Sequence, residues 1–79
     1  MALITEFAET QKHVAKVHKP VRCGYASFIG DDQRRYLLLE TYGSEDRQMP
    51  DKISQSIQLD EDAARQLVAI IKSEFLGID

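Results

Sequence analysis

The chain has 79 residues, of which 43% are hydrophobic and 29% charged, and its formal net charge at pH 7 is −3. This length allows one small domain, predicted over residues 1–79, which buries only about 60–65% of its unfolded surface on folding and therefore needs further stabilisation, such as a second subunit. The single cysteine, Cys23, excludes an internal disulfide and indicates a reducing, cytoplasmic location. Because no apolar run is long enough for a signal peptide or a bilayer span, we expect no contact with membranes.

The first third of the chain carries two weak strand signals. The segment Leu3–Phe7 fits either a strand or a fraying arm, and we expect an arm over residues 1–10. The segment His13–His18 is predicted to be a strand that closes at Pro20.

Three stronger strands follow. The segments Gly24–Ile29 and Arg35–Tyr42 favour strands and are joined by a short polar connection over 30–33, which is typical of a hairpin. The segment Ile53–Leu59 alternates between apolar and polar residues, so every second side chain lies on one half-buried face.

The last segment predicts an amphipathic helix over residues 60–76. Asp60 stands at the N-cap position, negative charges follow in the first turn, and Gly77 is a candidate for the residue that ends the helix. Ile70 lies at the shoulder of the apolar stripe, where it either joins the core or contacts a second subunit. The stripe itself consists of Ala64, Leu67, Val68, Ile71 and Phe75.

Consecutive strands followed by one helix predict an α+β fold. We expect a curved antiparallel sheet of about four strands with the C-terminal helix on one face. The other face is then left to solvent or to a ligand.

The charge is divided unevenly along the chain. Residues 10–30 hold four basic residues and no acid, whereas eleven of the thirteen acids lie in residues 31–79. This pattern fits either ordinary solvated lysines or a basic groove that binds phosphates, because the local field matters more than the net charge. The basic residues in question are Lys12, Lys16, Lys19 and Arg22, with Arg34 and Arg35 on the next strand.

Aromatic residues are a second feature of surfaces that bind nucleic acids. Tyr25, Phe28, Tyr36 and Tyr42 all lie in predicted strands, where most rings pack into the core. A tyrosine on the open face, close to the basic residues, would instead form a platform for an unstacked base.

Motifs for catalysis and metal binding are weak. The spacing of His13, His18 and Cys23 matches no standard zinc pattern, no serine has a motif with a base and an acid, and no glycine-rich phosphate loop is present. We therefore expect no enzyme activity, no cofactor, no metal and no small-molecule substrate. A thiol or metal enzyme built around Cys23 is the least favoured alternative.

The second half of the chain resembles the single-stranded-DNA-binding family of transcriptional coactivator positive cofactor four and its small bacterial relatives. The resemblance covers about residues 35–75 and rests on the strand Tyr36–Tyr42, the polar turn over 43–50, and Ile57–Asp62 at the start of the helix. It implies a curved sheet with a C-terminal helix, a homodimer, and a role in transcription or DNA maintenance.

Individual positions both match and depart from that family. Tyr42 stands where the family has an aromatic residue at the end of a strand, and residues 57–59 stand for its Ile-Ser/Thr-Leu. Gln55 and Ser56 replace the usual Lys-Gly, the nearest base is Lys52, and Glu40 stands where a base is often found.

Two hypotheses for function follow. The first is a homodimer that binds single-stranded DNA or RNA with little sequence preference. The alternative is a small protein–protein interaction module that uses the open face or edge of the sheet, or the helix shoulder around Ile70. In the first hypothesis, Tyr25 and Tyr42 stack on bases, and the basic residues that contact phosphates are Lys12, Lys16, Lys19, Arg22, Arg35 and Lys52.

Overall fold

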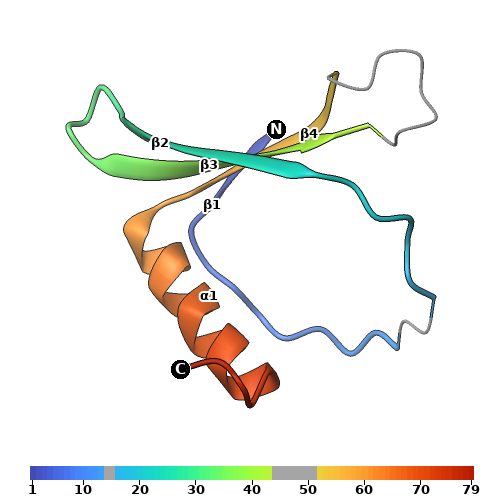
Figure 1. Cartoon of the computed structure of the whole chain (residues 1–79). Helices are drawn as coiled ribbons and strands as arrows, with labels where there is room; N and C mark the ends of the chain where they lie inside the picture. The colour runs from blue at the N-terminus through green and yellow to red at the C-terminus, as the bar shows by residue number, and fades with distance from the viewer. Residues whose placement is uncertain (14–15, 44–51) are drawn as a thin grey trace.

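The computed structural model describes residues 1–13, 16–43 and 52–79. Over these residues, the structure has a four-stranded sheet followed by one helix. Figure 1 shows that the sheet is twisted and that the helix descends on one side of it. The sheet has the order β1-β4-β3-β2, so β1 and β2 form its two edges. The predicted α+β fold with a C-terminal helix is confirmed. Its elements are β1 (Ala2–Ile4), β2 (Cys23–Ile29), β3 (Arg35–Tyr42), β4 (Ile53–Leu59) and α1 (Glu61–Glu74).

The sheet is mixed rather than wholly antiparallel. β3 is antiparallel to both β2 and β4, as predicted, but β1 pairs in parallel with β4. The expected N-terminal arm therefore begins with a short strand, in which Ala2 lies opposite Ile57 and Ile4 opposite Leu59. A further bond of 3.4 Å, from the N–H of Asp60 to the carbonyl of Ile4, continues this pairing to the start of the helix.

The predicted strand His13–His18 is wrong over the residues that the structure describes. Residues 5–13 and 16–22 form neither helix nor strand, and residues 8–13 and 16–22 are exposed, with Val17 at 92%. The edge of β4 that faces away from β3 is occupied by β1, so the described residues of this segment do not pair there, and they lie outside the sheet (Figure 1). Val14, the other apolar residue behind the prediction, lies outside the described residues.

The hairpin between β2 and β3 forms where it is predicted. The N–H of Gly30 donates to the carbonyl of Arg34 (2.9 Å), and the N–H of Gln33 donates to the carbonyl of Gly30 (3.0 Å). Gln33 adopts φ 65°, the left-handed conformation that closes a three-residue hairpin loop.

Asp32 fixes this loop through its side chain. Its carboxylate accepts hydrogen bonds from the hydroxyl of Tyr36 and from the N–H of Arg34, the second at 3.0 Å. The hydrogen bond from Tyr36 has the larger effect and that from Arg34 the smaller, and together they hold the pKa of the Asp32 carboxyl below its usual 3.8. The same bond to Asp32 raises the pKa of the Tyr36 hydroxyl above 10.0.

These two shifts predict how the hairpin responds to pH. The contribution of Asp32 to stability is complete above about pH 3.8 and is lost as the pH falls through its lowered pKa. The contribution of Tyr36 is complete below about pH 10.0 and is lost as the pH rises through its raised pKa. Replacing Tyr36 with phenylalanine should therefore move the pKa of Asp32 upward, toward 3.8, in a carboxyl titration followed by NMR. An unchanged pKa of Asp32 in this variant would contradict the bond.

The two faces of the sheet differ in composition. Cross-strand partners share a face, so Leu39 lies beside Ile57, and Leu37 beside Leu59. Leu59 is 2% exposed and Ala63, in the first turn of α1, is fully buried, so the helix begins against this apolar surface, which we call the inner face. The opposite surface, the outer face, carries Gly24, Ala26 and Phe28 of β2 and Tyr36, Leu38 and Glu40 of β3.

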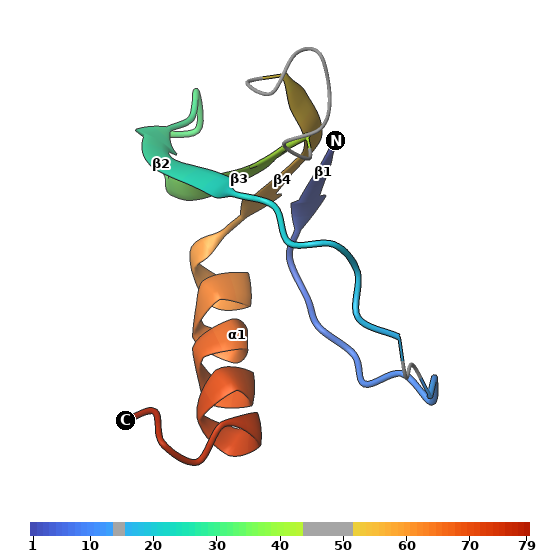
Figure 2. The same ribbon diagram turned by 45° about the vertical axis from the view of Figure 1, so that its right-hand side comes forward.

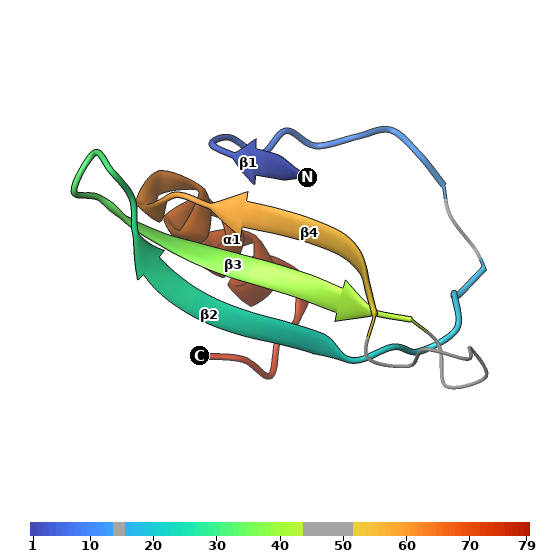
Figure 3. The same cartoon turned by 90° about the horizontal axis from the view of Figure 1, so that it is seen from above.

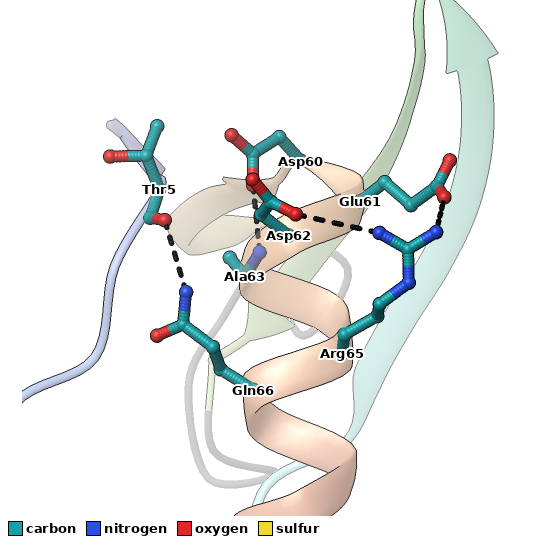
Figure 4. Close-up of polar contacts among 7 residues, drawn as sticks. All are labelled: Thr5, Asp60, Glu61, Asp62, Ala63, Arg65 and Gln66. Carbon is teal, nitrogen blue, oxygen red and sulfur yellow. Dashed lines mark hydrogen bonds and ion pairs between the residues drawn. The ribbon is translucent and has the colours of Figure 1, made fainter.

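The helix is capped as predicted and ends slightly earlier. The side chain of Asp60 accepts a hydrogen bond from the N–H of Ala63 (2.8 Å), and Arg65 forms ion pairs with Glu61 and Asp62 (Figure 4). The last helical residue is Glu74, and Phe75 caps the helix in an extended conformation, so Gly77 does not serve as the helix terminator.

The helix leaves the sheet steeply, as Figure 2 shows. Gln66 ties it to the chain that follows β1, through a bond of 2.8 Å from the N–H of Phe7 and a bond of 3.5 Å to the carbonyl of Thr5, the latter drawn in Figure 4. Leu59 and Ala63 are the hydrophobic residues that reach full burial within the described part of the chain. Much of the apolar stripe of α1 is exposed, including Val68 at 52% and Phe75 at 61%.

Candidate nucleic-acid interface

Arg22 and Tyr42 meet at one end of the outer face. The N–H of Tyr42 donates to the carbonyl of Arg22 (3.0 Å), so the two residues are neighbours across β2 and β3. The guanidinium carbon of Arg22 lies 5.7 Å from the centroid of the Tyr42 ring, within the range of a cation–π contact. This contact brings together a cation that can meet a phosphate and a ring on which a base can stack.

Gly24 makes room for the tyrosine. A Cβ atom at position 24 would lie 2.8 Å from the hydroxyl of Tyr42 and 3.3 Å from the ring carbon Cε2. The ring therefore extends over the backbone of β2, in a space that a side chain at position 24 would occupy. Sequence reasoning did not connect Gly24 with Tyr42, because only the strand register brings them together.

A second aromatic group, a pair of rings, lies at the other end of the outer face. The rings of Phe28 and Tyr36 are stacked, with their centroids 5.5 Å apart and their planes 26° from parallel. Phe28 is 36% exposed, so the pair is accessible from solvent. Between the two aromatic groups lies Glu40, which is half-buried and pairs with Gly24. Its negative charge separates two surfaces that can stack on bases, and it disfavours a phosphate at the centre of this face.

The basic segment leads directly into this site. Lys12, Lys16 and Lys19 lie in the exposed segment that precedes β2, and Arg22 is its last basic residue. Lys52 directly precedes β4, and its carbonyl accepts a bond of 3.1 Å from the N–H of Gly43. Lys52 is thus at the same end of the sheet as Tyr42, one residue from Ile53, the register partner of Tyr42.

Two of the predicted site residues lie on the other side of the sheet. Tyr25 is the register partner of Leu39, which places its side chain on the inner face, and it is 81% exposed. Arg35 lies on the same face, where its guanidinium donates to the hydroxyl of Ser27 (3.2 Å). Tyr25 and Tyr42 therefore cannot form one continuous stacking platform within a single chain.

The cysteine and the histidines do not form a site in the part of the chain that the structure describes. No group of three or more His, Cys, Asp and Glu residues is close enough there to hold a metal ion. The thiol of Cys23 is exposed and donates to the carbonyl of Gly24 at 3.5 Å. Over the same residues, no helix combines the length and the apolar content needed to cross a bilayer.

Comparison with protein-family models, with curated proteins and with solved structures gives no significant match.

Proposed function

We propose that this protein binds single-stranded DNA or RNA, with little sequence preference, through the outer face of its sheet. The observation that carries this proposal is the contact between Arg22 and Tyr42 at the point where the basic segment enters the sheet. Stacking on an aromatic ring is tolerant of sequence, because every base has a π-face, and the cations beside it bind the backbone that all sequences share.

The distribution of charge supports the same proposal. Residues 10–30 carry four positive charges and no negative ones, although the whole chain has a formal charge of −3. In the proposed complex, the strand follows this exposed segment, with phosphates near Lys12, Lys16 and Lys19, and a base reaches Tyr42. Lys52 extends the positive surface at the same end of the sheet. Tyr25 and Arg35 lie on the other face and contribute little to a single bound strand.

We further propose that the protein acts as a homodimer, in a process such as transcription or DNA maintenance. Small domains that bury few side chains are commonly stabilised by association, and here full burial is confined, within the described residues, to Leu59 and Ala63. The resemblance to the positive cofactor four family agrees with both parts of this proposal.

Fluorescence anisotropy with a labelled single strand of roughly ten to twenty nucleotides tests the binding directly. We expect saturable binding at low salt whose affinity falls steeply with added salt, because each phosphate contact to a single strand contributes about −0.7 to the slope of log K against log salt. Replacing Arg22 with glutamine should weaken binding and flatten this slope by about 0.7.

Replacing Arg65 with glutamine is the matched control. It removes the same charge from the helix, where Arg65 is paired with Glu61 and Asp62, and should leave the affinity unchanged. No binding at low salt would contradict the proposed function and favour the protein–protein interaction module instead.

A further inference from the structure

Among the residues that the structure describes, no strand pairs with the outer edge of β2. β2 is the last strand of the order β1-β4-β3-β2, and Figure 3 shows it along one margin of the sheet, with β1 on the opposite side. Its seven residues, Cys23–Ile29, include no charged residue and no proline, and its register with β3 is continuous. Natural edge strands are usually protected by charge, proline or a bulge, so an edge without these features is a template for another strand.

The backbone groups on this edge can be assigned from the register. The N–H of Tyr42 donates to the carbonyl of Arg22, and the N–H of Gly30 donates to the carbonyl of Arg34. In the register between these two bonds, the even-numbered residues of 22–30 direct their backbone N–H and C=O groups toward β3. Because bonding alternates along an antiparallel strand, the N–H and C=O groups of the odd-numbered residues point away from β3. Four residues thus offer free donors and acceptors along the edge: Cys23, Tyr25, Ser27 and Ile29.

We infer that β2 pairs antiparallel with β2 of a second copy of this chain, in a two-fold register centred on Ala26. In this register the backbone of Tyr25 exchanges hydrogen bonds with that of Ser27 of the second copy, and the backbone of Cys23 with that of Ile29. The outward N–H and C=O groups of all four residues are then hydrogen-bonded on both strands. A register shifted by two residues leaves at least one of these four outside the strand pair. Full use of the free backbone groups therefore selects the pairing around Ala26.

Charge complementarity favours a second copy as the partner. Arg22 precedes β2, and two acids, Asp31 and Asp32, follow it after Gly30. In the antiparallel register, Arg22 lies opposite Gly30 of the second copy and next to these two acids, and the symmetry produces this attraction twice. A parallel pairing would instead place Arg22 beside Arg22 and would not close into a dimer.

The pairing also completes the outer face. A two-fold axis through Ala26 stands perpendicular to the sheet, so both outer faces lie on the same side of an eight-stranded sheet. Gly24, over which the Tyr42 ring extends, then lies opposite Phe28 of the second copy, so the stacked rings of Phe28 and Tyr36 adjoin the Arg22–Tyr42 contact. The pairing itself is independent of ligand binding, whereas this joint surface rests on the proposed function.

Disulfide trapping tests the register. In the double variant Cys23→Ser, Ala26→Cys, the two introduced thiols face each other with their Cα atoms about 4.5 Å apart, within the range for a disulfide. We expect mild oxidation to link most of the protein into dimers. The wild-type chain is the matched control, because the two Cys23 residues would be about 20 Å apart along the paired strands and should not crosslink.

Sedimentation of the protein without nucleic acid tests the association. The wild type should have twice the 9.0 kDa mass of the chain. The variant Ser27→Pro should be monomeric, because it removes an outward N–H and leaves the bonds to β3 in place, whereas Ser27→Ala should remain dimeric. Circular dichroism checks that both variants are folded.

A monomeric wild type would overturn the inference. A dimer that persists in a folded Ser27→Pro variant, or that fails to crosslink through position 26, would also overturn it and would move the interface elsewhere, such as to the exposed stripe of α1. Because these measurements contain no nucleic acid, they can contradict the dimer while the proposed binding of single strands holds, and the reverse is equally possible.

Discussion

Replacing Leu59 with alanine should destabilise the protein by about 2–5 kcal/mol, the usual cost of truncating a buried leucine. Leu59 is 2% exposed and joins the inner face of the sheet to the first turn of α1, where Ala63 is fully buried. A chain of this length has a total stability of roughly 4–12 kcal/mol, so the loss should remove a large share of that stability. Urea denaturation followed by circular dichroism measures the change in the free energy of unfolding.

Ile53 provides the control on the same strand. It lies at the opposite end of β4 and is 45% exposed, so its replacement with alanine should cost much less than that of Leu59. An equal or larger loss for Ile53→Ala would mean that the contact between β4 and α1 is not the centre of the core.

Replacing Tyr42 with alanine should weaken the binding of a single-stranded oligonucleotide roughly 5- to 150-fold, which corresponds to the loss of about 1–3 kcal/mol of stacking on one base. The ring lies beside the guanidinium of Arg22 and extends over Gly24, so its removal takes away both the stacking surface and the support for the arginine. Anisotropy titration at low salt measures the loss, and circular dichroism checks that the sheet is intact.

Two further variants separate stacking from other effects. Tyr42→Phe keeps the ring and should retain most of the affinity. Tyr25→Ala removes a more exposed tyrosine from the inner face and should change binding little. If Tyr25→Ala weakened binding as much as Tyr42→Ala, the ligand would not be confined to the outer face.

Much of the fold can be predicted from local sequence patterns. Residues 53–59 alternate with period two, which predicts a strand, and residues 60–76 repeat their apolar positions at helical spacing, which predicts a helix. Both elements form close to those bounds. The sequence does not distinguish β1 from an arm, because three residues carry too little periodicity. Their parallel pairing with β4 depends on contacts between residues distant in sequence. The segment His13–His18 has local strand character, but its described residues pair with neither edge of the sheet.

The candidate site was predictable in its residues and not in its geometry. The basic segment and Tyr42 follow from composition and from the strand pattern, whereas the contact of Tyr42 with Arg22 and Gly24 depends on the register of β2 with β3. The same register separates Tyr25 from Tyr42, since Tyr25 pairs with Leu39, an odd number of residues from Tyr42. Such a separation cannot be known until the strands are aligned.

We place the bound strand on the outer face of the sheet, and amide chemical-shift mapping with a single-stranded oligonucleotide can locate it residue by residue. Shifts should cluster on the basic segment that ends at Arg22, on Gly24 and on Tyr42, while the exposed side of α1 around Arg65 stays unchanged. Shifts concentrated on α1, or the absence of shifts at Arg22 and Tyr42 under saturating conditions, would contradict binding on the outer face.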